Sequence, residues 1–419
     1  MKTVRLVVGI VICTLLVSLC SCGSFARRDY TSKDVAILPC EQLKRFFFPI
    51  EFNESGDLLY QDQLGEAFET LQKGTVKDIY IFVHGWDKTA SLAERDYQDF
   101  ICRFHAVGTA GTAQMHPHPP GSAGMKDAVI LGLFWPSTVL PNQNDASLFK
   151  PVTYYKIRQR ADELAVKGFQ TVLLEMQQLA RQRGDHFRMH FIGHSFGGRV
   201  LIKGLFKYLT NTANNPQWLF AWIDRMNFVL LLPAMSSDAL ETQRLRDSVV
   251  QEAIDVPLEK LIPGDTRAKI YEHRNDDIGP ELNLFTAFER EERIANQELE
   301  ERKWRSVQSM RQLSELYAPL RVFTVYSSND WANKYLFPMA STLTSDRIAC
   351  ALGGCGSGDE HKYYVDVGGY LASNESIQNA RLLDIDATAI ISSHTDIYKG
   401  RVASLIWQLV TLYPVIPVP

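Results

Sequence analysis

Short apolar and β-branched runs recur along the chain, and most of them are followed within two residues by a glycine, proline or serine. They span 78–83, 127–134, 187–192, 226–232, 320–326 and 380–386. Longer segments with apolar residues at a 3.6-residue spacing lie between these runs, at 155–179 and 196–209, and after the last of them, at 397–412. This alternation predicts strands and amphipathic helices in an α/β fold, with a mostly parallel central sheet flanked by helices.

One long segment, 239–318, interrupts the alternation of strands and helices. Its second half is highly charged and contains acid-before-base pairs four residues apart, such as Glu289–Arg293 and Glu298–Arg302. Such pairs stabilise an exposed helix by a few tenths of a kcal/mol each. We expect either a helical cap over a pocket or a solvated surface helix, inserted in an α/β domain that spans 76–419.

The first 21 residues have the pattern of an export signal, ahead of an N-terminal segment at 22–75. Lys2 and Arg5 precede an apolar run over 6–19, which is shorter than the roughly 20 residues needed to span a bilayer. The run ends in Leu19-Cys20-Ser21-Cys22, which resembles a bacterial lipobox. This resemblance implies cleavage before Cys22, its acylation, for example by palmitate, and a lipoprotein anchored in the cell envelope, facing the periplasm or the exterior. A plain signal peptide or an uncleaved anchor is the alternative.

Composition narrows the class of protein further. The 419 residues include 46% hydrophobic and 22% charged residues, which is typical of a globular protein. The formal net charge is −4, and no basic surface for nucleic acid is indicated. Four cysteines follow the predicted lipid site, Cys40, Cys102, Cys350 and Cys355, and export predicts disulfides among them in any of three pairings.

The sharpest chemical feature is Gly193-His194-Ser195-Phe196-Gly197. An apolar strand precedes it and a helical pattern follows it, which is the setting of a nucleophile elbow. The serine of such an elbow occupies a strained turn, and small flanking residues such as Gly193 and Gly197 let strand and helix approach. Ser195 is therefore the predicted nucleophile.

A serine nucleophile needs a base and an acid, which follow it in the chain order serine, acid, histidine. Of the three downstream histidines, His394 lies between the last strand and the last helix, whereas His273 and His361 lie in an insertion and a loop. Asp330 follows the strand at 320–326 and is the predicted acid. Asp238, after the preceding strand, is the alternative.

Two main-chain N–H groups are predicted to stabilise the oxyanion, those of Phe196 and Trp86. Trp86 follows His84-Gly85 at the end of the first predicted strand. We expect His84 and Gly85 to shape this loop rather than to act as a base or donor.

Together, His84-Gly85-Trp86, the Ser195 elbow, Asp330 and His394 resemble the α/β-hydrolase superfamily. Phe134-Trp135-Pro136-Ser137 also resembles a segment of uncharacterised bacterial serine hydrolases that have a His-Gly-Trp loop. The resemblance implies hydrolysis of an ester, thioester or amide without a metal or organic cofactor. A carboxylic ester, small or lipid-like, is the predicted substrate, with an amidase or thioesterase as alternatives.

Two other classes of function stay open at this point. His116 and His118 could ligate a metal, although few carboxylates lie near them in the sequence. A non-catalytic envelope lipoprotein could instead use the same fold as a binding module, although Ser195, Asp330 and His394 are all present.

Overall fold

The computed structural model describes the parts of the chain in which the predicted strands lie. The described residues are 46–73, 76–86, 88, 90–109, 127–138, 150–184, 186–210, 223–235, 320–338, 351–356, 362–371 and 382–411. The predicted signal, Cys22 and the insertion at 239–318 lie outside them. None of the helices within these ranges combines the length and the apolar character that crossing a membrane requires.

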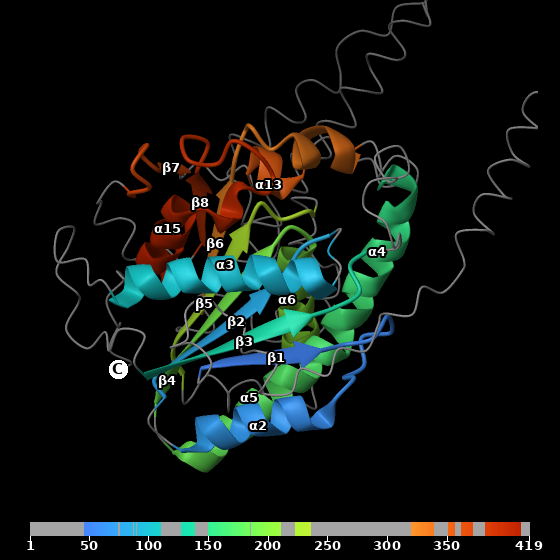
Figure 1. Cartoon of the computed structure of the whole chain (residues 1–419), viewed down its shortest axis with the longest axis vertical. Helices are drawn as coiled ribbons and strands as arrows, with labels where there is room; N and C mark the ends of the chain where they lie inside the picture. The colour runs from blue at the N-terminus through green and yellow to red at the C-terminus, as the bar shows by residue number, and fades with distance from the viewer. Residues whose placement is uncertain are drawn as a thin grey trace, which may run out of the picture.

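In the described part of the chain, a single parallel sheet of eight strands forms the centre of the fold (Figure 1). The strands are β1 (Phe47–Glu51), β2 (Asp78–Val83), β3 (Ala128–Phe134), β4 (Phe187–His194), β5 (Ile223–Leu231), β6 (Leu320–Tyr326), β7 (Lys362–Tyr364) and β8 (Leu382–Asp386). Their order across the sheet is β1-β3-β2-β4-β5-β6-β8-β7, and every neighbouring pair is parallel. The predicted parallel sheet is confirmed.

Six strands coincide with the six predicted runs, and the two that were not predicted are the edge strands β1 and β7. β1 contains Pro49, which lacks an N–H for the ladder and is tolerated at an edge. The sheet therefore begins inside the segment 22–75, ahead of the predicted start of the α/β domain at residue 76.

Helices cover both faces of the sheet. α2 (Gln61–Gln72), α4 (Lys150–Val166), α5 (Gly168–Arg183) and α6 (Phe196–Thr210) share one apolar core with the sheet, and α3 (Ala90–Thr109) and α15 (Gly400–Thr411) share the other. Shorter helical turns are η7 (Ala332–Leu336), α13 (Leu352–Cys355) and η8 (Asp396–Tyr398). The three-layer arrangement agrees with the predicted α/β class.

The single helix predicted over 155–179 is wrong, because two helices, α4 and α5, meet there at Lys167 and Gly168. A side chain at position 168 would place its Cβ 2.5 Å from the ring of Phe52. Glycine therefore allows the chain to pass close to Phe52, and its poor helix propensity favours a break at the same point.

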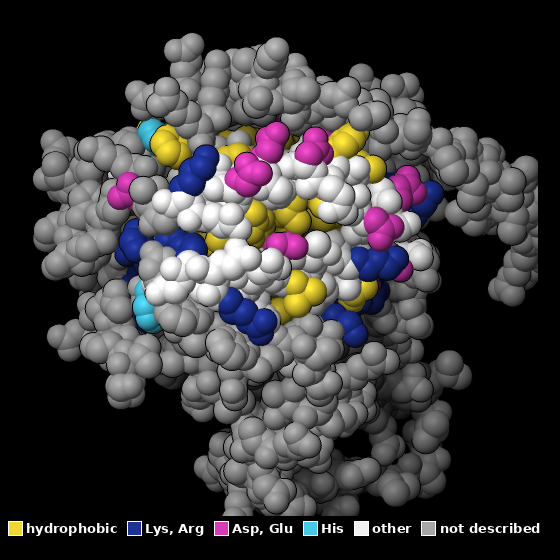
Figure 2. Space-filling model, turned by 90° about the horizontal axis from the view of Figure 1, so that it is seen from below, with side chains coloured by type: hydrophobic (Ala, Val, Ile, Leu, Met, Phe, Trp, Pro, Cys, Tyr) yellow, Lys and Arg dark blue, Asp and Glu magenta, His cyan; other side chains and the backbone are white. Residues whose placement is uncertain are grey.

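The surface and the disulfides add two observations. On the side where α2 and α5 lie in Figure 1, described acidic and basic side chains are interspersed with hydrophobic ones (Figure 2). Mixed charge of this kind is typical of a solvated surface. Cys102 in α3 and Cys355 in α13 are both disulfide-bonded, in agreement with the prediction of disulfides among the four cysteines.

Candidate active site

The predicted loops meet where the strand order of the sheet changes direction. In the sheet, β2 lies between β3 and β4. The chain therefore continues from β2 to β3 on one side of β2 and then crosses to β4 on the other side. In open parallel sheets, ligands bind at the carboxyl ends of the strands at such a point. Here β2 ends before His84-Gly85-Trp86 and β4 ends at His194, directly before Ser195.

Ser195 forms the turn between β4 and α6 and has a φ of 54°. This left-handed conformation is rare for residues other than glycine and marks local strain of the kind that a nucleophile elbow requires. Around it, a Cβ at Gly193 would lie 2.7 Å from the carbonyl carbon of Gly197, and a Cβ at Gly197 would lie 2.0 Å from the carbonyl oxygen of Val83. Both glycines are therefore required by the close packing of strand and helix.

The loop after β2 lies against the serine. A Cβ at Gly85 would be 2.7 Å from the Cβ of Ser195, so only glycine fits between loop and elbow. The ring of Trp86 packs edge-on against the rings of Phe196 and Tyr154, with both pairs of centroids 6.1 Å apart. The two predicted oxyanion donors, Trp86 and Phe196, thus belong to segments that flank Ser195.

His84 anchors the same loop to the segment after β3. Its Nδ1 lies 2.9 Å from the carbonyl oxygen of Gly85, and its Nε2 accepts the N–H of Trp135 at 3.3 Å. Trp135 also donates from Nε1 to the His84 carbonyl at 3.0 Å. Ser137 Oγ accepts the N–H of Lys88 and donates to its carbonyl, both at 3.1 Å. Trp135 and Ser137, which the sequence singled out only by resemblance, therefore brace the loop.

These contacts predict a pH dependence of stability that involves His84. Burial lowers the pKa of His84 to about 3, whereas an unfolded histidine titrates near 6.5. Between these values the unfolded chain binds more protons, so the stability contributed here falls as pH decreases from 6.5. One such group lowers the free energy of unfolding by about 2 kcal/mol between pH 6.5 and pH 5.

The change from His84 to glutamine should therefore weaken the acid sensitivity of folding. We expect the free energy of unfolding to fall by about 2 kcal/mol less between pH 7 and pH 5 than in the wild type. Urea unfolding of both proteins at the two pH values measures this difference. Equal losses in the two proteins would show that His84 is not held neutral by the fold.

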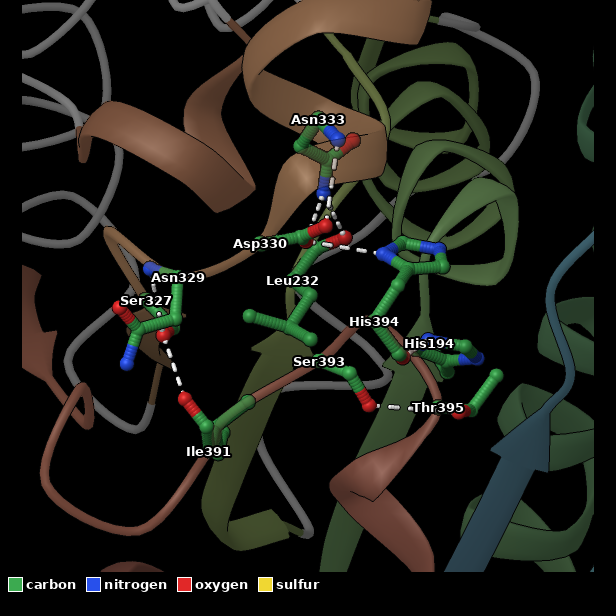
Figure 3. Close-up of polar contacts among 10 residues, drawn as sticks. All are labelled: His194, Leu232, Ser327, Asn329, Asp330, Asn333, Ile391, Ser393, His394 and Thr395. Atoms are coloured by element: carbon green, nitrogen blue, oxygen red, sulfur yellow. Dashed lines mark hydrogen bonds and ion pairs between the residues drawn. The ribbon is translucent and has the colours of Figure 1, made fainter.

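Asp330 and His394 lie side by side, in the segments that follow β6 and β8 (Figure 3). His394 Nδ1 is 2.8 Å from Asp330 Oδ2, and the carboxylate is fully buried while the imidazole is partly exposed. A proton on Nδ1 donates to the carboxylate and leaves Nε2 free to act as a base.

Asn333 orients the carboxylate and was not predicted from the sequence. It donates from Nδ2 to Asp330 Oδ2 at 2.7 Å and from its main-chain N–H to Oδ1 at 3.2 Å. The same Nδ2 donates to the carbonyl of Leu232 at 2.7 Å, and Leu232 has a φ of 46°. Asn333 thus ties the predicted acid to a second left-handed turn at the end of β5.

The structure brings some of the predicted catalytic residues into hydrogen-bonding contact but not others. Asp330 and His394 are in contact, but among the described residues no hydrogen bond connects Ser195 Oγ to His394. Such contacts are often long in the absence of substrate and tighten in the reactive complex. Asp238, His273 and His361 lie outside the described residues.

The metal-ligand candidates His116 and His118 also lie outside the described residues. Within the described part of the chain, no group of three or more histidine, cysteine, aspartate or glutamate side chains could bind a metal. Comparison of the chain with family models, curated proteins and solved structures found no match. Function is therefore inferred from the geometry of the site.

Proposed function

We propose that this chain is a serine hydrolase with an α/β-hydrolase architecture that cleaves carboxylic esters. The proposal rests on one observation. The hydrogen-bonded Asp330–His394 pair and a serine in a left-handed strand-to-helix turn all follow the carboxyl ends of strands in one parallel sheet. Their chain order of serine, acid and histidine is the order of nucleophile-elbow enzymes.

In the proposed mechanism, His394 Nε2 takes the proton of Ser195 Oγ as the oxygen attacks the acyl carbon. Asp330 stabilises the imidazolium through Nδ1, and the N–H groups of Phe196 and Trp86 stabilise the oxyanion. His394 then protonates the departing alcohol. In the second half of the reaction, His394 takes a proton from water as the water attacks the acyl-enzyme, and it returns a proton to Ser195 Oγ as the acid leaves. The mechanism needs no metal or organic cofactor.

The proposed substrate class follows from the proposed location. An acyl anchor on Cys22 would place the enzyme at a membrane, where esters of lipids and other acyl chains are the accessible substrates. The insertion at 239–318 is the proposed cap over the acyl pocket. We therefore favour lipid-like esters over small polar ones.

A fluorophosphonate probe tests the proposal, because it reacts only with an activated serine. We expect rapid labelling of the purified wild-type protein and none of the Ser195→Ala variant. Ser55→Ala, which removes an exposed serine from the loop after β1, is the matched control and should label like the wild type. Failure of the folded wild-type protein to label would contradict the proposal and favour a binding module.

A further inference from the structure

His194 connects the nucleophile elbow to the loop that carries the predicted base. It is the last residue of β4, directly before Ser195, and its side chain is buried. His194 Nε2 donates to the main-chain carbonyl of His394 at 3.0 Å, and the two ring centroids are 4.7 Å apart (Figure 3). This residue was assigned no role from the sequence.

Two contacts fix His394 from different directions. The bond from His194 fixes its main chain, and the bond to Asp330 Oδ2 fixes the rotation of its ring. A third contact, from Ser327 Oγ to the carbonyl of Ile391 at 2.7 Å, anchors the loop three residues earlier. Of these three contacts, the one from His194 is the one that comes from the elbow itself.

Packing alone does not account for an imidazole at position 194. Its Nδ1 is buried and has no hydrogen-bond partner among the described residues, and a Cβ at Gly85 would lie 2.9 Å from it. An unpaired buried acceptor costs about 1–3 kcal/mol, which an apolar side chain would avoid. The donor at Nε2 is the group that distinguishes histidine from such a side chain here.

The environment of His194 also keeps it uncharged. Burial, and then the nearby charges of His394 and Lys88, lower its pKa well below the usual value. A neutral ring does not oppose the positive charge that His394 acquires during proton transfer. It also leaves one proton, on Nε2, for the carbonyl of His394.

We propose that His194 is a positioning residue, which sets the location of the His394 base relative to Ser195 through the His394 main-chain carbonyl. This inference rests on the proposed function. It predicts that the N–H donor, rather than the volume or the aromatic ring, is the property needed at position 194.

Two substitutions separate the donor from the volume. His194→Met keeps an unbranched side chain of similar length without a donor, whereas His194→Gln places an amide N–H near the position of Nε2. We expect kcat for a p-nitrophenyl ester and the rate of fluorophosphonate labelling to fall about 10–100-fold in His194→Met, with KM nearly unchanged. His194→Gln should remain within about fivefold of the wild type, because it restores the donor.

A control variant removes a buried histidine from the other part of β4. His190 bonds to Asp78 and Asn227 and lies four residues, about 13 Å, from His194. His190→Gln is expected to lower stability without lowering kcat of the folded protein. If His194→Met does not fold, His194→Asn replaces it, because its shorter amide does not reach the carbonyl.

The outcomes separate this inference from the proposed function. Slow labelling of His194→Met with rescue by glutamine supports the inference. Labelling of both variants at the wild-type rate, or equal slowing of both, overturns it and leaves the hydrolase proposal standing. Absence of labelling in the wild type overturns the hydrolase proposal and this inference with it.

Discussion

The change from Asp330 to asparagine is expected to lower kcat about 10³–10⁴-fold, with little change in KM. An asparagine at this position in a triad disfavours the histidine tautomer that has its proton on Nδ1. The loss falls on the transition state, because ester binding does not require a charged acid next to the base.

The hydrogen bonds around Asp330 explain why an amide cannot replace its carboxylate. Asn333 Nδ2 and His394 Nδ1 both donate to Oδ2, and the main-chain N–H of Asn333 donates to Oδ1. An amide at position 330 has only one oxygen for these donors. Whichever way it turns, its NH₂ group faces a donor, either that of Asn333 or that of His394.

Asp238→Asn is the comparison variant, since Asp238 is the alternative acid. It should keep wild-type kcat in the same ester assay. Retention of activity in Asp330→Asn together with its loss in Asp238→Asn would transfer the role of the acid to Asp238. Thermal unfolding of both variants separates loss of chemistry from loss of fold.

The sequence predicts the central part of the fold because the buried strands of a parallel sheet are continuous apolar runs. β4, predicted over 187–192, spans Phe187–His194, and β6 coincides with its prediction at Leu320–Tyr326. The strands fix which loops lie at the carboxyl edge. The placement of Asp330 and His394 near each other could therefore be predicted from their positions after two strands.

The sequence of helix α3 has a helical pattern that the predicted elements do not include. Its buried residues Ala93, Tyr97, Phe100, Ile101 and Phe104 follow helical spacing, yet no helix was predicted there. The edge strand β7 could not be predicted in this way, because its three residues are too few to show a strand pattern in the sequence.

The supporting residues of the site could not be predicted, for a physical reason. Asn333 contacts Leu232, which is 101 residues earlier, and Ser137 contacts Lys88, which is 49 residues earlier. His194 contacts the carbonyl of His394, 200 residues away. Polar side chains that bond to distant main-chain groups have no periodicity, so a single sequence shows the reacting groups but not what orients them.

A substitution at Gly197 tests the packing that brings the elbow to the oxyanion loop. We expect Gly197→Ala to lower the free energy of unfolding by about 3 kcal/mol and to abolish ester hydrolysis. The added Cβ would lie 2.0 Å from the carbonyl oxygen of Val83 and 2.9 Å from that of His84. Because both neighbours are main-chain atoms, no rotamer change relieves the contact, and α6 has to move away from β2.

Gly65→Ala provides the matched control for this change. Gly65 lies on the exposed face of α2, and no described atom outside its own turn of helix would lie within 4 Å of a Cβ there. Alanine is the better helix former by about 1 kcal/mol, so this variant should be slightly more stable than the wild type. Urea unfolding of the two variants measures both effects. Wild-type stability in Gly197→Ala would mean that α6 does not approach β2 this closely, and the oxyanion loop would then have to be placed elsewhere.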